Sequence, residues 1–177
     1  MDSEELAGKL AAFDAAMSDE PYPAPRPGEW GAEMILAHAA TVNRLVAVSV
    51  ASVIGAEPVA YSNRLAGSEP LLRALVAETG GVPELRADVL RTGRVLVRLA
   101  TDLGPAAGTP VQTRIAEGDH VIVDGPVPAL ALIGSALGYH LGVHREQLAA
   151  LGGVPATVGS PTGTATAATK PTSAVAT

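Results

Sequence analysis

Four stretches of this chain repeat apolar residues at every third or fourth position, and proline or glycine separates each stretch from the next. This spacing puts the apolar side chains on one face of an α-helix, which becomes stable when that face packs against other helices. The pattern therefore predicts a mainly helical fold. The predicted helices cover residues 3–18, 28–54, 68–103 and 126–151.

Local signals define the ends of these helices. Ser3 is the expected N-cap of the first helix, ahead of two glutamates. Four prolines within residues 21–27 exclude helix and predict an extended connector. Gly80, Gly81 and Pro83 interrupt the third helix, which we expect to be kinked or split at this point.

The stretch before the last helix has a different period. Residues 111–123 alternate apolar and polar side chains, with Gly118 and Asp119 between two runs, and this alternation predicts a short β-hairpin. The expected fold class is therefore all-α, a four-helix bundle with a short β-hairpin before the last helix. We expect residues 1–152 to form this one domain and residues 153–177, rich in Ala, Thr, Gly and Pro, to be a disordered low-complexity tail.

Composition argues against several classes of protein. The formal net charge of −6, without a basic run, argues against nucleic-acid binding. The absence of cysteine excludes disulfides and thiolate metal ligands supplied by the chain. The N-terminus lacks the features of a signal peptide, and the most apolar run, residues 45–56, is too short to span a bilayer. We therefore expect a cytoplasmic protein that does not bind membranes.

Three of the four histidines lie on predicted core-facing stripes. His140 and His144 are four residues apart on the last helix, together with Leu137 and Leu151, so their rings lie on one face. His38 shares a stripe of the second helix with Met34, Thr41, Leu45 and Val48. If both stripes face inward, three imidazoles meet inside the bundle.

Three imidazole nitrogens are the ligand set of an open, catalytic type of metal site, which keeps a position for water or substrate. Such a site in a helical bundle is built from inward side chains of facing helices. Two other interpretations of the histidines stay open, namely a buried hydrogen-bonded cluster and a pH-sensitive cluster.

Other residues near these histidines have a functional and a structural interpretation. For Trp30 the two interpretations are that it lines a pocket and that it anchors the start of the second helix. For Gln147 they are that it supports His144 as a metal ligand and that it makes an ordinary hydrogen bond at the helix end. Thr41 could hydrogen-bond a ligand or water. Arg44 binds an anionic substrate or forms an ion pair at the edge of the bundle. His120 lies in the predicted hairpin and is expected at the surface.

Two segments resemble the DinB-like proteins. Residues 27–44 read PxEWxxxxILAHAATVNR, similar to the region around the first histidine of that family, and residues 139–151 read YHLGVHREQLAAL, similar to its closing HxxxHxxQL motif. The resemblance covers about residues 6–151. This superfamily also includes the metal-binding domain of mycothiol-dependent maleylpyruvate isomerase.

The resemblance implies an up-and-down-type four-helix bundle with an atypical connection and a divalent metal on His38, His140 and His144. Zinc is the expected metal, with nickel, iron and manganese as alternatives. The implied function is a metal-dependent enzyme of the thiol-transferase or isomerase type, which acts on a small molecule with a low-molecular-weight thiol as cosubstrate. A metal-dependent hydrolase is the other enzyme class that the resemblance leaves open. The alternative is a non-catalytic bundle that binds a partner or an apolar ligand, with the metal structural or absent. The sequence leaves homodimerisation open.

Overall fold

The computed structural model describes residues 1–18 and 21–152; the predicted tail, residues 153–177, lies outside the described residues. The α-helices are α1 (Ser3–Ala15), α2 (Ala32–Ile54), α3 (Glu69–Thr79), α4 (Val82–Asp102), α5 (Ala129–Gly134) and α6 (Leu141–Leu151). The strands are β1 (Tyr61–Ser62), β2 (Pro110–Glu117) and β3 (His120–Pro128). Two shorter helical segments are η1 (Gly104–Gly108) and η2 (Ser135–His140).

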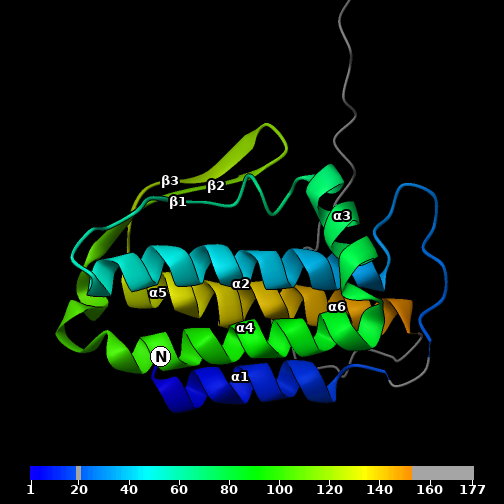
Figure 1. Ribbon diagram of the computed structural model, residues 1–177, viewed down its shortest axis with the longest axis horizontal. Coiled ribbons are helices and arrows are strands. Elements are labelled where there is room, and N and C mark those ends of the chain that lie inside the picture. Colours follow the sequence, from blue (N-terminus) through cyan, green and yellow to red (C-terminus); the bar gives the residue numbers. More distant parts are fainter. Residues whose placement is uncertain (19–20, 153–177) are drawn as a thin grey trace, which may run out of the picture.

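The fold is mostly helical, as predicted, with a small sheet at one side. Helices α1, α2, α4 and the continuous stretch α5–η2–α6 run alongside one another, while α3 lies across one end (Figure 1). Helix α2 packs against α4 and against the last helical stretch, and α1 packs against α4 and α6. This arrangement puts α2 next to α5–η2–α6, the two elements that carry the three histidines of interest.

The helix boundaries differ from the predicted ones in ways that local chemistry explains. The third predicted helix is split into α3 and α4 because Gly80 and Gly81 both have positive φ angles, 105° and 132°. The cap of α1 is Asp2 and not Ser3, since its carboxylate accepts a hydrogen bond from the Glu5 amide at 2.8 Å. Helix α2 begins at Ala32, after a turn in which Gly28 has a φ of 87°.

The core lies between the helices and is built almost entirely from aliphatic side chains. The predicted stripe of α1 is buried, including Leu6 and Phe13. The predicted stripe of α2 is wrong at one position, because Val48 is 60% exposed while Val46 and Val50 face the core. The buried face of α2 is therefore rotated away from Val48 toward these two valines.

The predicted two-stranded hairpin belongs to a three-stranded sheet. Strands β2 and β3 pair antiparallel around Gly118 and Asp119, and the two-residue strand β1 pairs parallel with β2 on the other side. β1 precedes the loop that reaches the histidines. Strand β3 continues to Pro128, so the last helical stretch begins at Ala129 and not at residue 126 as predicted.

The last helical stretch is not a uniform α-helix. Between α5 and α6, η2 has the wider π-helical form over six residues and ends at His140. π-Helical turns inside α-helices are rare and occur frequently at functional sites. The wider turn changes the direction in which His140 and the preceding residues project relative to a regular helix.

Helix α2 is long and apolar enough to cross a membrane by length and composition alone, and no other helix of the described residues passes this test. In this structure 61% of its most apolar stretch is buried. A core helix of a water-soluble protein has the same property, so the observation does not distinguish the two settings.

Leu10 of α1 packs directly against Gly93 of α4. A Cβ atom at this position would lie 2.6 Å from Leu10 Cδ1. We expect Gly93→Ala to lower the free energy of unfolding by about 1 kcal/mol or more, because the strain outweighs the helix propensity gained. Urea denaturation measures the change.

Gly8→Ala on α1 is the matched control, since nothing lies within 4 Å of a Cβ atom there. We expect this change to stabilise the protein by about 0.5–1 kcal/mol. Equal effects of the two substitutions would contradict close α1–α4 packing at Gly93.

Candidate metal centre

His38 projects from the N-terminal third of α2 and is held by the loop that follows β1. Its Nδ1 donates a hydrogen bond to the carbonyl oxygen of Ala66 at 2.8 Å. A carbonyl oxygen can only accept, so the Nδ1 atom carries the proton and, in the neutral ring, Nε2 has a free lone pair. The lone pair points at His140, whose Nε2 lies 2.9 Å away.

His144 has the same arrangement on α6. Its Nδ1 donates to Oε1 of Gln147 at 2.7 Å, one turn further along the helix. The Nε2 atom of His144 lies 3.0 Å from Nε2 of His140. His144 is buried, with 6% of its surface exposed.

His140 lies between the other two histidines, at the junction of η2 and α6. Its Nε2 faces both neighbouring Nε2 atoms, and its Nδ1 is buried without a hydrogen-bond partner among the described residues. The three ring centroids are 4.3–4.9 Å apart. The predicted histidines of α2 and the last helix thus come together in one cluster.

The three neutral rings do not have enough N–H protons to make a hydrogen bond at both short nitrogen–nitrogen contacts. Nε2 of His38 and of His144 are both lone-pair acceptors in the neutral rings, so only His140 could supply a proton, and it could serve one neighbour. The other pair of nitrogens about 3 Å apart then has no proton available between its two atoms. A cation placed between the three nitrogens satisfies all of them at once.

The geometry fits a transition-metal ion. Metal–nitrogen bonds of about 2.0–2.1 Å, at angles between right and tetrahedral, separate two ligand nitrogens by about 2.8–3.4 Å. The two measured separations, 2.9 and 3.0 Å, lie at the short end of this range. Three histidines close together could therefore hold a metal ion. Within residues 1–18 and 21–152, no carboxylate joins this group.

Burial keeps the three rings neutral near pH 7. Desolvation lowers the pKa of His38, and it lowers the pKa of His144 to about 4, with a further contribution from His38. The pKa of His140 falls well below its usual value, first through burial and then through the charges that its two neighbours would carry. Neutral imidazole is the form that binds metals, so the site is in its ligand form at neutral pH.

Of the other residues considered from the sequence, Trp30 lies at the cluster, whereas Thr41 is buried within α2 and His120 is exposed. Trp30 packs beside the cluster, with its ring centroid 5.3 Å from that of His38. Thr41 donates to the Ala37 carbonyl within its own helix and does not face the histidines through its hydroxyl. Arg44 forms an ion pair with Asp88. His120 is exposed on β3 and is not part of the cluster.

One contributor to the site was missed from the sequence. The Ala66 carbonyl orients His38, but a backbone carbonyl has no residue-type signature, and only the pairing of β1 with β2 brings this loop across α2. Gln147 was identified as a candidate support for His144 and makes that hydrogen bond.

Without metal, the cluster should make stability depend on pH. In the unfolded chain the histidines take up protons near pH 6.5, whereas folded His144 does so near pH 4. The unfolded state therefore binds more protons between these values, so stability is full above about pH 6.5 and falls as the pH is lowered. His144 alone contributes on the order of 3 kcal/mol to this loss.

Urea unfolding of chelator-treated protein at about pH 7 and about pH 5 measures this dependence. His120→Ala, which removes an exposed histidine, should leave it unchanged. A free energy of unfolding that is the same at both pH values would contradict neutral, buried rings.

Comparisons of the chain with family models, with curated proteins and with solved structures found no match. The class of site is therefore defined by its residues: three converging imidazoles between two helices of a mostly helical protein.

Proposed function

We propose that this chain is a divalent-metal-binding protein of the DinB-like type, with His38, His140 and His144 as the metal ligands. The observation that carries the proposal is the convergence of three Nε2 atoms, two of them on rings whose Nδ1–H is already bound to an acceptor. Hydrogen-bonded Nδ1 groups fix the tautomer and orientation of metal-binding histidines. This feature favours a metal site over a purely hydrogen-bonded cluster.

The fold supports the same assignment. A DinB-like four-helix bundle would consist of α1, α2, α4 and α5–η2–α6, with α3 and the sheet as connecting elements. The connection from α2 to α4 runs back along the molecule through β1 and α3, so that α2 and α4 point the same way (Figure 1). This corresponds to the atypical connection that the family resemblance implies.

We further propose that the protein is a metal-dependent enzyme that uses a low-molecular-weight thiol on a small-molecule substrate. The absence of cysteine means that a reacting thiol has to come from a cosubstrate. A bound divalent metal supplies Lewis-acid chemistry, which lowers the pKa of a ligated thiol or water. The three histidines hold their nitrogens toward one point, and Trp30 shields the His38 side. The three-ligand set leaves positions for water or substrate.

Trp30 provides the test, because it is the only tryptophan and lies next to His38. We expect cobalt(II) added to tag-free, chelator-treated protein to quench its fluorescence, with saturation at about one equivalent. Zinc is expected to compete with cobalt. The absence of a saturable change, together with no heat of zinc binding, would contradict the metal site.

The thiol step is tested separately in cobalt-loaded protein. A small thiol should produce a sulfur-to-cobalt charge-transfer band in the near ultraviolet if a coordination position is open to it. A visible spectrum unaffected by thiol would favour the alternative function, a non-catalytic bundle with a structural metal. Zinc is the expected native metal, with nickel, iron and manganese as the other candidates.

A further inference from the structure

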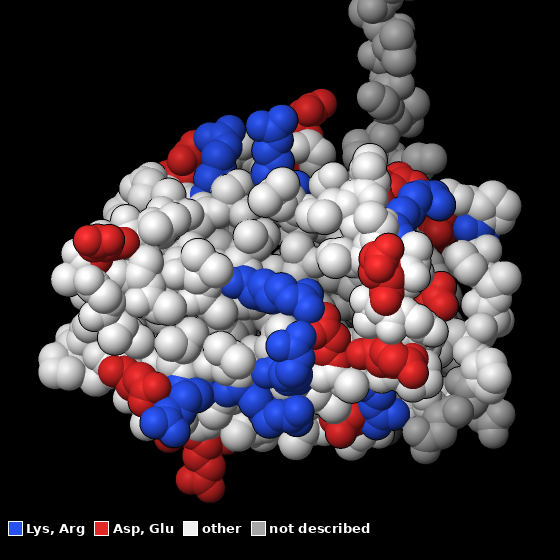
Figure 2. Space-filling model, in the orientation of Figure 1, with Lys and Arg blue, Asp and Glu red and all other residues white. Residues whose placement is uncertain are grey.

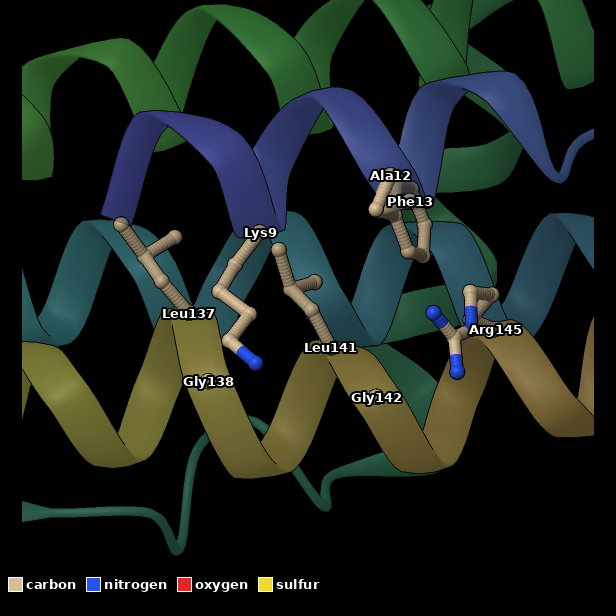
Figure 3. A pocket seen from close by; sticks show the side chains of 8 residues that line it. All are labelled: Lys9, Ala12, Phe13, Leu137, Gly138, Leu141, Gly142 and Arg145. Carbon is tan, nitrogen blue, oxygen red and sulfur yellow. The ribbon is translucent and has the colours of Figure 1, made fainter. Parts of the chain in front are cut away.

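A cavity lies where α5–η2–α6 packs against α1, and none of the three clustered histidines lines it. Its volume is about 80 Å³, and Lys9 of α1 and Arg145 of α6 both line it (Figure 3). The space exceeds what one water molecule requires. None of the described residues that line it is acidic. The cavity therefore contains two cationic side chains and no neutralising carboxylate.

Lys9 does not form an ion pair with Glu5, although both residues lie on α1. Glu5 precedes it by four residues, an arrangement in which glutamate and lysine commonly pair on a helix surface. No such pair occurs between them among the described residues. The Lys9 side chain instead extends from α1 toward Gly138 on the neighbouring helix (Figure 3).

Arg145 differs from the other arginines of the described chain. Most of them are paired with aspartate or glutamate, and Figure 2 shows such opposite charges side by side on one face. The arginines without an ion pair within residues 1–18 and 21–152 are Arg26, Arg64, Arg94 and Arg145. The first three are exposed, while Arg145 is half-buried. Arg145 therefore brings a positive charge to the cavity without a carboxylate partner among the described residues, so an anion from solution can pair with it.

Gly142 keeps the cavity open on the side of the last helix, whereas a Cβ atom at Gly138 would lie 3.2 Å from Met1 Cε. Gly138 and Gly142 lie along this helix one turn apart, next to Leu137 and Leu141. A Cβ atom at Gly142 would meet no atom within 4 Å, so a side chain there would project into free space. The missing side chain leaves room beside Arg145 for a small ligand.

We propose that this cavity is a binding site for a small tetrahedral oxyanion of the phosphate class, held between the Lys9 ammonium and the Arg145 guanidinium. Guanidinium binds such oxyanions through two parallel hydrogen bonds, and an ammonium adds a third donor group. The site is separate from the metal centre, because His140 and His144 face α2 whereas the cavity faces α1. It does not depend on the proposed enzymatic function.

The experiment is calorimetric titration of the chelator-treated full chain with inorganic phosphate, at ionic strength held constant with sodium chloride. We expect saturable binding of one phosphate, weakened by about tenfold or more in Lys9→Met and in Arg145→Met, since each removes a charge-assisted hydrogen bond. Gly142→Leu should weaken binding similarly by filling the space while both cations remain. Arg94→Met, which removes an exposed arginine without an ion pair on α4, is the control and should bind as the native chain does.

Acetate distinguishes phosphate from carboxylate ligands, and we expect it to bind more weakly than phosphate. The proposal is overturned if phosphate shows no saturable binding, if acetate binds as tightly, or if Arg94→Met weakens binding as much as Arg145→Met. Circular dichroism verifies that each variant is folded. If Arg145→Met is not folded, Gly142→Leu decides, because it leaves both charges in place and replaces glycine with a better helix former.

Discussion

Replacing His140 by alanine will weaken metal binding by about a hundredfold or more, an effect as large as any expected of a single substitution in this protein. His140 is the central histidine, since its Nε2 lies 2.9 Å from that of His38 and 3.0 Å from that of His144. Its removal leaves only the Nε2 atoms of His38 and His144 as ligands for the metal. Competition with a chromophoric chelator measures the affinity.

The native fold should survive this change. The His140 Nδ1 atom has no hydrogen-bond partner among the described residues, and Nε2 contacts only His38 and His144, so the loss of His140 breaks no hydrogen bond outside the histidine cluster. His120→Ala is the control and should keep native affinity, because His120 is exposed on β3. Stoichiometric, tight binding by a folded His140→Ala protein would show that the ligand assignment is wrong.

Gln147→Leu should give the largest effect of any substitution outside the three histidines, a loss of about 10–100-fold in metal affinity. The Gln147 amide oxygen accepts the Nδ1 proton of His144 at 2.7 Å and thereby keeps the lone pair on Nε2. Leucine fills a similar volume but cannot accept this proton, so the other tautomer of His144, which cannot bind metal through Nε2, becomes populated.

Gln147→Glu distinguishes the hydrogen-bonding role of Gln147 from its contribution to packing. Glutamate restores an acceptor at nearly the same position, and we expect its affinity to be at least native, because a carboxylate raises the basicity of the ring. The measurement is the same chelator competition. Equal affinities of the leucine variant and the native protein would mean that Gln147 does not position His144.

Much of the fold could be predicted because helical periodicity is a direct consequence of burial on one face. The break at Gly80 and Gly81 was predicted and occurs, since both residues have positive φ angles. Val48 was placed on the wrong face, because α2 is apolar around most of its circumference and a stripe of α2 residues did not distinguish Val48 from the buried Val46.

The histidine cluster was predicted from the two core-facing stripes, but the backbone around His140 differs from the regular α-helix that was predicted. The spacing of Leu137, His140 and His144 reads as regular helix, but the turn that ends at His140 is π-helical. Such a turn depends on how the whole stretch packs against α1 and α2, which spacing in one segment does not encode. The same limit applies to the Ala66 carbonyl, whose position depends on pairing between strands far apart in the sequence.

The most direct test of the metal centre is metal analysis of tag-free protein after zinc reconstitution and removal of excess ion. The account predicts about one equivalent of zinc in the native chain and almost none in His144→Ala, because each histidine supplies one of three ligands. Less than about a tenth of an equivalent in the reconstituted native protein would contradict the central claim that these imidazoles form a metal site.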